Sequence, residues 1–446
     1  MRSLLKAICL IITTIPCVAP ATAAVSVHPV FAASEQVVIN EPPYDPPGLG
    51  IELEVTTLTY RSPGKNWQDL TATERESLKG KPLIPENFPP VPPTKKWKLT
   101  GEISPANLMT EMIVDGRQHR VGDDDTYTIG REIIDYVDKW YAFCKSTKCQ
   151  ATIEGNPAGA NPWEVTFWKR YVDAIFQAQV TTAMPMEGVL QVLQDSKAQN
   201  QDNALINVGQ DYNSKIVIVK PGSFESFPRI RHEDINAEFL GFFSLLASYC
   251  VAASEGDPNH GPKRGLNIMP RTNFLTMYKT FAKKKLKEQL AAGVSLYDIV
   301  RVVAALDDRK WDIRNRKFKW KPQDLGKPVD EHWPGKEDDI RSGELSVEKF
   351  LNTLEPLPTA STPPLDLLML MDKMVRHGQI GGLGDRMEGV YGNNRKPAPI
   401  LEFRDLPNVC KDGVALRMKA YNQQVVDLHG KATTLDREEA GELSEL

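Results

Sequence analysis

Alternation of apolar and polar residues predicts the strands of this chain. In the stretch Gly48–Val55, aliphatic residues alternate with Glu52 and Glu54, and successive side chains of a strand point to opposite faces. The pattern therefore predicts a strand that carries two carboxylates side by side. Similar alternation or β-branched runs predict further strands at 97–103, 112–115, 215–219 and 400–406, and a strand pair or a strand and turn over 163–182.

Segments with apolar residues at helical spacing are interspersed with these strands. The apolar residues of 130–143 fall on one helical face. Thr71 and Glu74 resemble a capping arrangement for a short helix within 67–81. Further helices are predicted at 186–193, 236–253, 272–290, 295–306, 365–377 and 415–430.

Strands that are separated by turns as often as by helices are typical of one fold class. We expect an α+β fold in which helices back an antiparallel sheet. The 446 residues, 41% hydrophobic and 25% charged, suffice for a single large domain over 48–432. We expect an extended N-terminal segment at 25–47, a surface insertion at 307–364 and a disordered acidic tail at 433–446.

The first 24 residues have the features of a signal peptide. Arg2 and Lys6 precede an apolar run over 7–15, and small residues at 21–23 suit a cleavage site. We therefore expect a secreted, extracellular protein. No later stretch offers the roughly 18 to 20 apolar residues of a spanning helix, so we expect no membrane span.

Four cysteines follow the signal peptide: Cys144, Cys149, Cys250 and Cys410. An even number suits the oxidising environment of secreted proteins. The short spacing favours a disulfide between Cys144 and Cys149. Cys250 and Cys410 then form either a long-range disulfide or two buried thiols.

Charge and motif patterns argue against several functional classes. The net charge of −4 provides no basic excess for nucleic acid. The seven histidines show no paired ligand spacing, which argues against a zinc site, and no serine lies in a Gly-x-Ser-x-Gly motif. The glycine-rich loop 378–385 lacks the Gly-Lys-Ser/Thr ending of a phosphate-binding loop, so we expect a turn or a lid there.

Charged residues on two predicted strands are the candidates for a site. Glu402 and Arg404 share a face of the last predicted strand. If that face adjoins Glu52 and Glu54, the three carboxylates could hold a hard cation such as Mg²⁺. Arg404 and Arg271 could then contact a phosphate or carboxylate group. A purely structural ion pair between strands is the alternative, and the residues leave both open.

Cys410 and Arg417 suggest a different chemistry. A cysteine followed by an arginine before a helix resembles the catalytic loop of tyrosine phosphatases. The two residues are one position farther apart here, which would misplace the guanidinium relative to a phosphoryl group. A cysteine-dependent phosphatase that uses Cys410 is therefore an alternative function.

Four motifs together resemble one group of secreted proteins. They lie at 51–54, 268–274, 378–388 and 401–406, and they look like those of secreted fungal proteins labelled heat-labile-enterotoxin-like. The resemblance spans most of the mature chain. It implies a virulence effector or toxin-like protein that acts on a host protein, outside or inside host cells. Long members carry an ADP-ribosyltransferase head, which we do not expect here.

A second resemblance concerns the charged residues themselves. The early Glu52 and Glu54 and the late Glu402 and Arg404 resemble the amidoligase branch of the glutamine synthetase and glutamate-cysteine ligase fold. This resemblance implies that the three glutamates bind magnesium under ATP and that Arg404 contacts phosphate. The family's histidine-containing strand is matched here only by 177–181, which has glutamines instead.

These resemblances define the expected function and its alternatives. We expect a secreted fungal effector on an amidoligase-like scaffold that uses Mg²⁺ and ATP. The alternatives are an effector that binds a host protein without catalysis, and the phosphatase.

Overall fold

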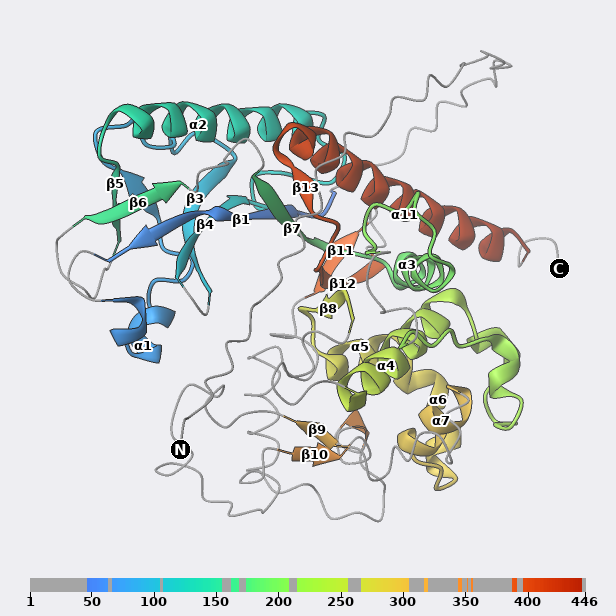
Figure 1. Ribbon diagram of the computed structural model, residues 1–446. Coiled ribbons are helices and arrows are strands. Elements are labelled where there is room, and N and C mark those ends of the chain that lie inside the picture. The colour runs from blue at the N-terminus through green and yellow to red at the C-terminus, as the bar shows by residue number, and fades with distance from the viewer. Residues whose placement is uncertain are drawn as a thin grey trace, which may run out of the picture. The chain divides into compact units, whose positions relative to one another are not determined.

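The computed structural model describes residues 46–62, 66–104, 107–154, 162–167, 174–207, 215–255, 266–304, 317–319, 344–346, 351, 354–355, 387–390 and 396–442 (Figure 1). Among them, eleven strands form one sheet and eight α-helices accompany it. The predicted α+β class, an antiparallel sheet backed by helices, is thus confirmed.

The sheet is built from strands taken from almost the whole described chain. They are β1 (Leu49–Arg61), β2 (Leu83–Pro85), β3 (Trp97–Ile103), β4 (Leu108–Val114), β5 (Gln150–Ile153), β6 (Trp163–Phe167), β7 (Ile175–Ala183), β8 (Ile268–Pro270), β11 (Met387–Val390), β12 (Lys396–Phe403) and β13 (Val409–Cys410). Two further short strands, β9 (Lys317–Lys319) and β10 (Glu344–Ser346), pair only with each other among the described strands.

The central strand is β1, which covers residues 49–55 of the predicted strand 48–55 and continues to Arg61. Its first half, Leu49–Val55, pairs with β7, and its second half, Leu58–Arg61, pairs with β6. Strand β4 lies along the other edge of β1 and pairs in turn with β3. Strand β12 pairs with the far edge of β7. The order across the middle of the sheet is therefore β12, β7, β1, β4 and β3, with antiparallel pairing throughout.

The helices have the following bounds: α1 (Ala72–Glu76), α2 (Thr126–Ser146), α3 (Met186–Ala198), α4 (Ala237–Glu255), α5 (Phe274–Phe281), α6 (Lys283–Ala291), α7 (Leu296–Val303) and α11 (Val414–Glu442). The short α1 has the predicted capping box, because the Thr71 hydroxyl accepts from the backbone N–H of Glu74 and the Glu74 carboxylate accepts from that of Thr71.

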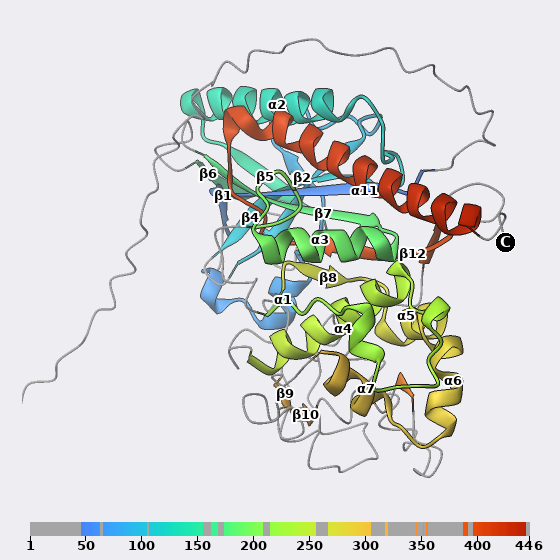
Figure 2. The ribbon, with the colours of Figure 1, turned by 90° about the vertical axis from the view of Figure 1, so that its right-hand side faces the viewer.

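The two long helices α2 and α11 cover one face of the sheet (Figures 1 and 2). They approach closely at Gly130, where a Cβ atom would lie 2.7 Å from the Cα atom of Ala415. The aliphatic residues of β1 are buried in the same core as the apolar side of α2, and Ile51 and Val55 are fully buried. The glutamates of β1 point to the opposite face.

One segment predicted as a strand is not one. Residues 215–219 are extended and partly buried but belong to no sheet. The backbone N–H groups of Val217 and Val219 donate instead to the hydroxyls of Ser248 and Ser244, at 2.8 and 2.9 Å. These serines lie four residues apart on α4, so a helix face supplies the acceptors that a neighbouring strand would otherwise provide.

The helix predicted over 272–290 is divided at Ala282, whose φ of −128° and ψ of −35° are not helical. Helix α5 buries Phe274, Met277, Tyr278 and Phe281, and α6 buries Leu286 and Leu290. At about 100° per residue, a continuous helix would point the two leucines roughly 120–160° away from the apolar side of α5. The break allows both halves to face the core.

The chain end and the predicted insertion also differ in part from expectation. Helix α11 continues to Glu442, into the stretch 433–446 that was expected to be disordered. Within 307–364, Leu351 and Leu354 are buried in the core. The helix predicted at 365–377, the glycine-rich loop and the signal peptide lie outside the described residues.

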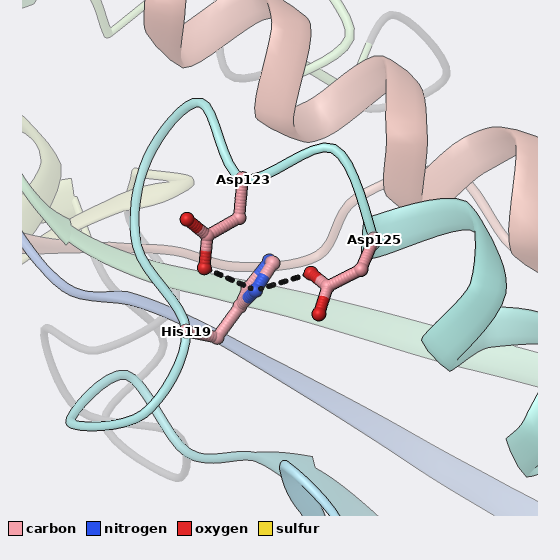
Figure 3. A group of neighbouring side chains, drawn as sticks. All are labelled: His119, Asp123 and Asp125. Atoms are coloured by element: carbon pink, nitrogen blue, oxygen red, sulfur yellow. Dashed lines mark ion pairs between the residues drawn. The ribbon is translucent and has the colours of Figure 1, made fainter.

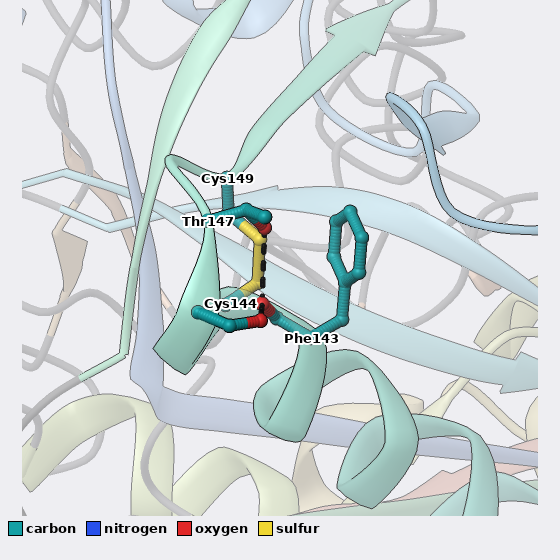
Figure 4. Close-up of a disulfide and its surroundings, with 5 residues drawn as sticks. Phe143, Cys144, Thr147 and Cys149 are labelled. Atoms are coloured by element: carbon teal, nitrogen blue, oxygen red, sulfur yellow. Dashed lines mark hydrogen bonds between the residues drawn. A yellow bond between two sulfur atoms is a disulfide. The ribbon is translucent and has the colours of Figure 1, made fainter.

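The predicted disulfide between Cys144 and Cys149 is present (Figure 4). It closes the C-terminal end of α2, where the Thr147 hydroxyl also donates to the carbonyl of Phe143 at 3.0 Å. Cys250 is a buried free thiol, whereas Cys410 is disulfide-bonded, so both expected alternatives, a Cys250–Cys410 disulfide and a pair of free thiols, are wrong. In the described part of the chain, no helix is long and apolar enough to cross a membrane.

Candidate functional site

The strands place the three predicted glutamates on one face of the sheet. Glu52 pairs with Gln179 on β7, and Glu402 of β12 pairs with Thr181, two residues further along β7. Paired residues share a face, as do residues two apart. Glu52, Glu54 and Glu402 therefore lie on the face opposite to α2 and α11, with β7 between their two strands.

Two more glutamates on the other side of β1 join this group. Glu111 of β4 pairs with Glu54, and Thr100 of β3 pairs with Glu111. Glu102 follows two residues after Thr100, so it also lies on this face. Glu102 and Glu111 are 8% and 4% exposed, which is unusual for carboxylates. Neither is predicted as a site residue from the sequence, because glutamates alternating in a strand normally indicate a solvent-facing side.

We call the group Glu52, Glu54, Glu102, Glu111 and Glu402 the acidic sheet face. Its charges are only partly balanced by three basic residues: Arg271, Arg404 and Lys79.

Both predicted arginines contact Glu402. The Nη2 atom of Arg271 pairs with Oε2 of Glu402, and the Nε atom of Arg404 pairs with Oε1. Arg271 follows β8, which pairs with β12 so that Met269 lies opposite Glu402. The Glu402 carboxylate is fully buried, whereas each arginine side chain is 27% exposed. Glu402 thus orients two guanidinium groups that remain open to solvent or a ligand.

Burial, and then repulsion between neighbouring carboxylates, disfavours the charged forms of the remaining glutamates. Burial, and then the charge of Glu102, raises the pKa of Glu54 to about 7. Burial, and then the charge of Glu52, raises the pKa of Glu111 to about 8. Burial and the charge of Glu402 also raise the pKa of Glu52, which shares a hydrogen bond with Glu111. Such a bond between two carboxyl groups requires a proton on one of them.

Neutral side chains hold two of these carboxylates in place. The amide Nε2 of Gln179 donates to Oε1 of Glu54 at 2.5 Å, and the hydroxyl of Thr100 donates to Oε2 of Glu111 at 3.1 Å. Gln179 lies in the segment 177–181 that was compared with the family's histidine strand. The carboxylates are therefore positioned by hydrogen bonds as well as by the sheet.

Carboxylates with raised pKa values release their protons to a cation that binds them through oxygen. Among the described residues, three carboxylate or imidazole ligand atoms converge within 4.8 Å only at His119, Asp123 and Asp125, so a cation on the acidic sheet face would have to draw the glutamates closer together. Glu52, Glu54 and Glu111 have the most available oxygens for this. Both oxygens of Glu402 already contact guanidinium groups, so its immediate role is to position Arg271 and Arg404.

The residues of the phosphatase alternative lie elsewhere. Cys410 ends β13 at the edge of β7, and Arg417 belongs to α11 on the helix-covered face. Neither takes part in the acidic sheet face.

Comparison of the chain with family models, with curated proteins and with solved structures finds no match.

Proposed function

We propose that the protein is a metal-dependent enzyme of the amidoligase type, with the acidic sheet face as its active site. The observation that carries this proposal is the position of Glu402, Arg404 and Arg271 on the same sheet face as Glu52 and Glu54. A cluster of carboxylates beside two partly exposed arginines offers both ligand types that a magnesium–nucleotide complex needs.

Each residue has a distinct proposed role. Glu52 and Glu54, with Glu111 beside them, hold Mg²⁺ through carboxylate oxygens. Arg271 and Arg404 contact the phosphates of ATP, and Glu402 fixes the direction of both guanidinium groups. When bound, Mg²⁺ and ATP supply an activated phosphoryl group for amide-bond formation.

The raised pKa values support this division of roles. Without a cation, the carboxyl groups of Glu54 and Glu111 keep protons near neutral pH, because burial and like charges destabilise the carboxylates. A divalent cation reverses that effect, since it supplies the missing positive charge. Binding should therefore release protons and become tighter as pH rises from 6 to 8.

The signal-peptide pattern and the resemblance to secreted fungal proteins add a setting to this proposal. The protein is secreted and acts on a host protein. Since ATP is abundant inside cells, ligase activity requires entry into the host cell.

A non-catalytic effector that binds a host protein is the competing function. It is favoured by one observation, the engagement of both oxygens of Glu402 with arginines, which is what a structural ion-pair network would also show. In that case the acidic sheet face would bind no nucleotide.

Calorimetry separates the two functions. Mg²⁺ with a non-hydrolysable ATP analogue is titrated into the wild type, into the double variant Glu52→Gln/Glu54→Gln and into the control Glu288→Gln, which removes an exposed carboxylate from α6. We expect binding by the wild type and the control and none by the double variant. Absence of binding by folded wild type would reject the ligase proposal and leave the binding function.

A further inference from the structure

We propose that His119, Asp123 and Asp125 form a binding site for a first-row divalent cation, with Zn²⁺ as the best match. The three residues lie in the loop between β4 and α2, and their side chains converge (Figure 3). This inference does not depend on the proposed ligase function, because none of the three belongs to the acidic sheet face.

The two separations between Nδ1 of His119 and the aspartate oxygens match a tetrahedral metal site, and all three ligand atoms lie within 4.8 Å of one another. Nδ1 of His119 lies 3.3 Å from Oδ2 of Asp123 and 3.3 Å from Oδ1 of Asp125. Zn²⁺ bonds of about 2.0–2.1 Å in a tetrahedron separate neighbouring ligand atoms by roughly 3.3 Å. A charge-assisted N–H···O bond would instead bring the atoms to about 2.7–2.9 Å. Both carboxylates therefore stand at the distance expected of co-ligands.

The hydrogen bonds of Thr126 determine which nitrogen of His119 faces the carboxylates. The Thr126 hydroxyl donates to the backbone carbonyl of Asp123 at 3.0 Å and accepts from the Asn422 amide at 2.9 Å. The same hydroxyl lies 3.0 Å from Nε2 of His119. Since its single proton is already used, Nε2 of His119 must be the donor.

The other ring nitrogen, Nδ1, then faces only the two aspartates, each at 3.3 Å. In the neutral ring, Nδ1 of His119 directs its lone pair toward two carboxylates, which is repulsive unless a cation lies between them. The His119 side chain is fully buried, and Nδ1 makes no hydrogen bond with any described residue. Buried polar atoms are rarely left in this state. A metal ion bound by Nδ1 would satisfy it.

Asp125 also points toward the proposed ion. It occupies the N-cap position of α2, where an aspartate usually accepts from the first backbone N–H groups of the helix. Its side chain makes no such bond, and its buried Oδ1 atom has no hydrogen-bond partner among the described residues. This unused oxygen is the one that faces His119.

Lys96 is the internal competitor for this site. Its Nζ atom lies 3.1 Å from Oδ2 of Asp123 and 2.8 Å from Oδ2 of Asp125. The side chain is 34% exposed, so the ammonium group can move into solvent when a metal ion binds. Removing this charge should make the site bind Zn²⁺ more tightly.

The bound ion would have a structural effect. The loop is tied to α11 through Asn422, which accepts from the backbone N–H of Gly122 at 2.8 Å and donates to the carbonyl of Asp123 at 2.8 Å. An ion held by His119 and Asp125 would fix the same loop to the start of α2. Zn²⁺ should therefore raise the melting temperature of the protein.

Competition with a chromophoric zinc chelator tests the proposal on the full chain. We expect one Zn²⁺ per wild-type chain at this site, at least about tenfold tighter binding by Lys96→Gln, and at least about tenfold weaker binding by Asp125→Asn, because each changes one strong electrostatic contact. Asp125→Asn keeps the size of the side chain at a partly exposed position, so folding should be retained. His119→Gln provides a further test, with circular dichroism to check its fold.

Two controls make the result specific. Glu52→Gln/Glu54→Gln, which alters the acidic sheet face, should leave this zinc affinity unchanged. In the Glu52→Gln/Glu54→Gln background, in which the acidic sheet face lacks two of its proposed ligands, the melting temperature should rise with Zn²⁺ when Lys96 is kept or changed to glutamine but not when Asp125→Asn is added. If neither the wild type nor Lys96→Gln binds Zn²⁺, the proposal fails. Binding that Asp125→Asn and folded His119→Gln retain unchanged would also overturn it.

Discussion

Replacing Glu54 with glutamine should remove a pH dependence that the acidic sheet face imposes on folding. The pKa of Glu54 rises from 4.5 to about 7 in the folded protein, chiefly through burial and then through the charge of Glu102. Between these values the folded chain holds a proton that the unfolded chain has lost. The stabilising effect is therefore complete below pH 4.5 and is lost as pH rises toward 7.

The size of the effect follows from the same two pKa values. Each pH unit in this interval removes about 1.4 kcal/mol, so the free energy of unfolding should fall by about 3 kcal/mol between pH 4.5 and pH 8 because of Glu54 alone. Glutamine resembles the protonated side chain and does not titrate. Glu54→Gln should thus match the wild type near pH 4.5 and exceed its stability by about 3 kcal/mol at pH 8.

Urea unfolding in the presence of EDTA measures this difference without interference from bound cations. The free energy of unfolding is determined from pH 4.5 to pH 8 for the wild type, Glu54→Gln and the exposed control Glu288→Gln. The control should follow the wild type at every pH. Parallel curves for Glu54→Gln and the wild type would show that Glu54 is not crowded by other carboxylates, and the account of the acidic sheet face would be wrong.

Three further predictions concern the fold. Burial lowers the pKa of His429 from 6.5 to about 4, so the stability that the neutral imidazole contributes is lost as pH falls from 6.5 toward 4. In urea unfolding, the free energy of unfolding should therefore fall by about 3 kcal/mol less over this pH range in His429→Gln than in the wild type. An equal fall in both proteins would contradict the assignment. Gly130→Ala should lower the melting temperature because its Cβ would meet the α11 backbone, whereas Gly430→Ala, with open space around it, should raise it slightly. Ser248→Ala leaves the N–H of Val217 unpaired and should cost about 1–3 kcal/mol in urea unfolding, and a neutral result would mean that another group accepts this bond.

The positions of strands and helices could be predicted from the sequence better than the pairing of the strands in the sheet. Alternation placed Glu52 and Glu54 on one strand face, and the capping residues Thr71 and Glu74 located a short helix. Such signals are local and depend on a few neighbouring residues. Glu111 was missed because its burial depends on how β4 pairs with β1, which no local pattern encodes.

Two other differences between prediction and structure also arise from contacts that no local sequence pattern encodes. The β-branched segment 215–219 has the composition of a strand, but the hydroxyls of Ser244 and Ser248 on a distant helix accept its backbone hydrogen bonds. The spacing of the histidines indicates no zinc site, whereas in the folded chain His119 meets two aspartates of the same loop. In both cases the outcome depends on a contact between residues that meet only in the folded chain, the serine hydroxyls with the backbone of 215–219 and the aspartates with His119.

The central position of β1 has a consequence for how the protein is made. Glu52 is synthesised early, but β7 must follow before one edge of β1 can pair, and β12 brings Glu402 to the face 350 residues after Glu52. Contacts over such separations form slowly, because long loops must be ordered first. Until the C-terminal part emerges, the early glutamates lack the strand that positions the two arginines. A chain that lacks β12 would thus have the early glutamates without Glu402 and the two arginines that Glu402 positions.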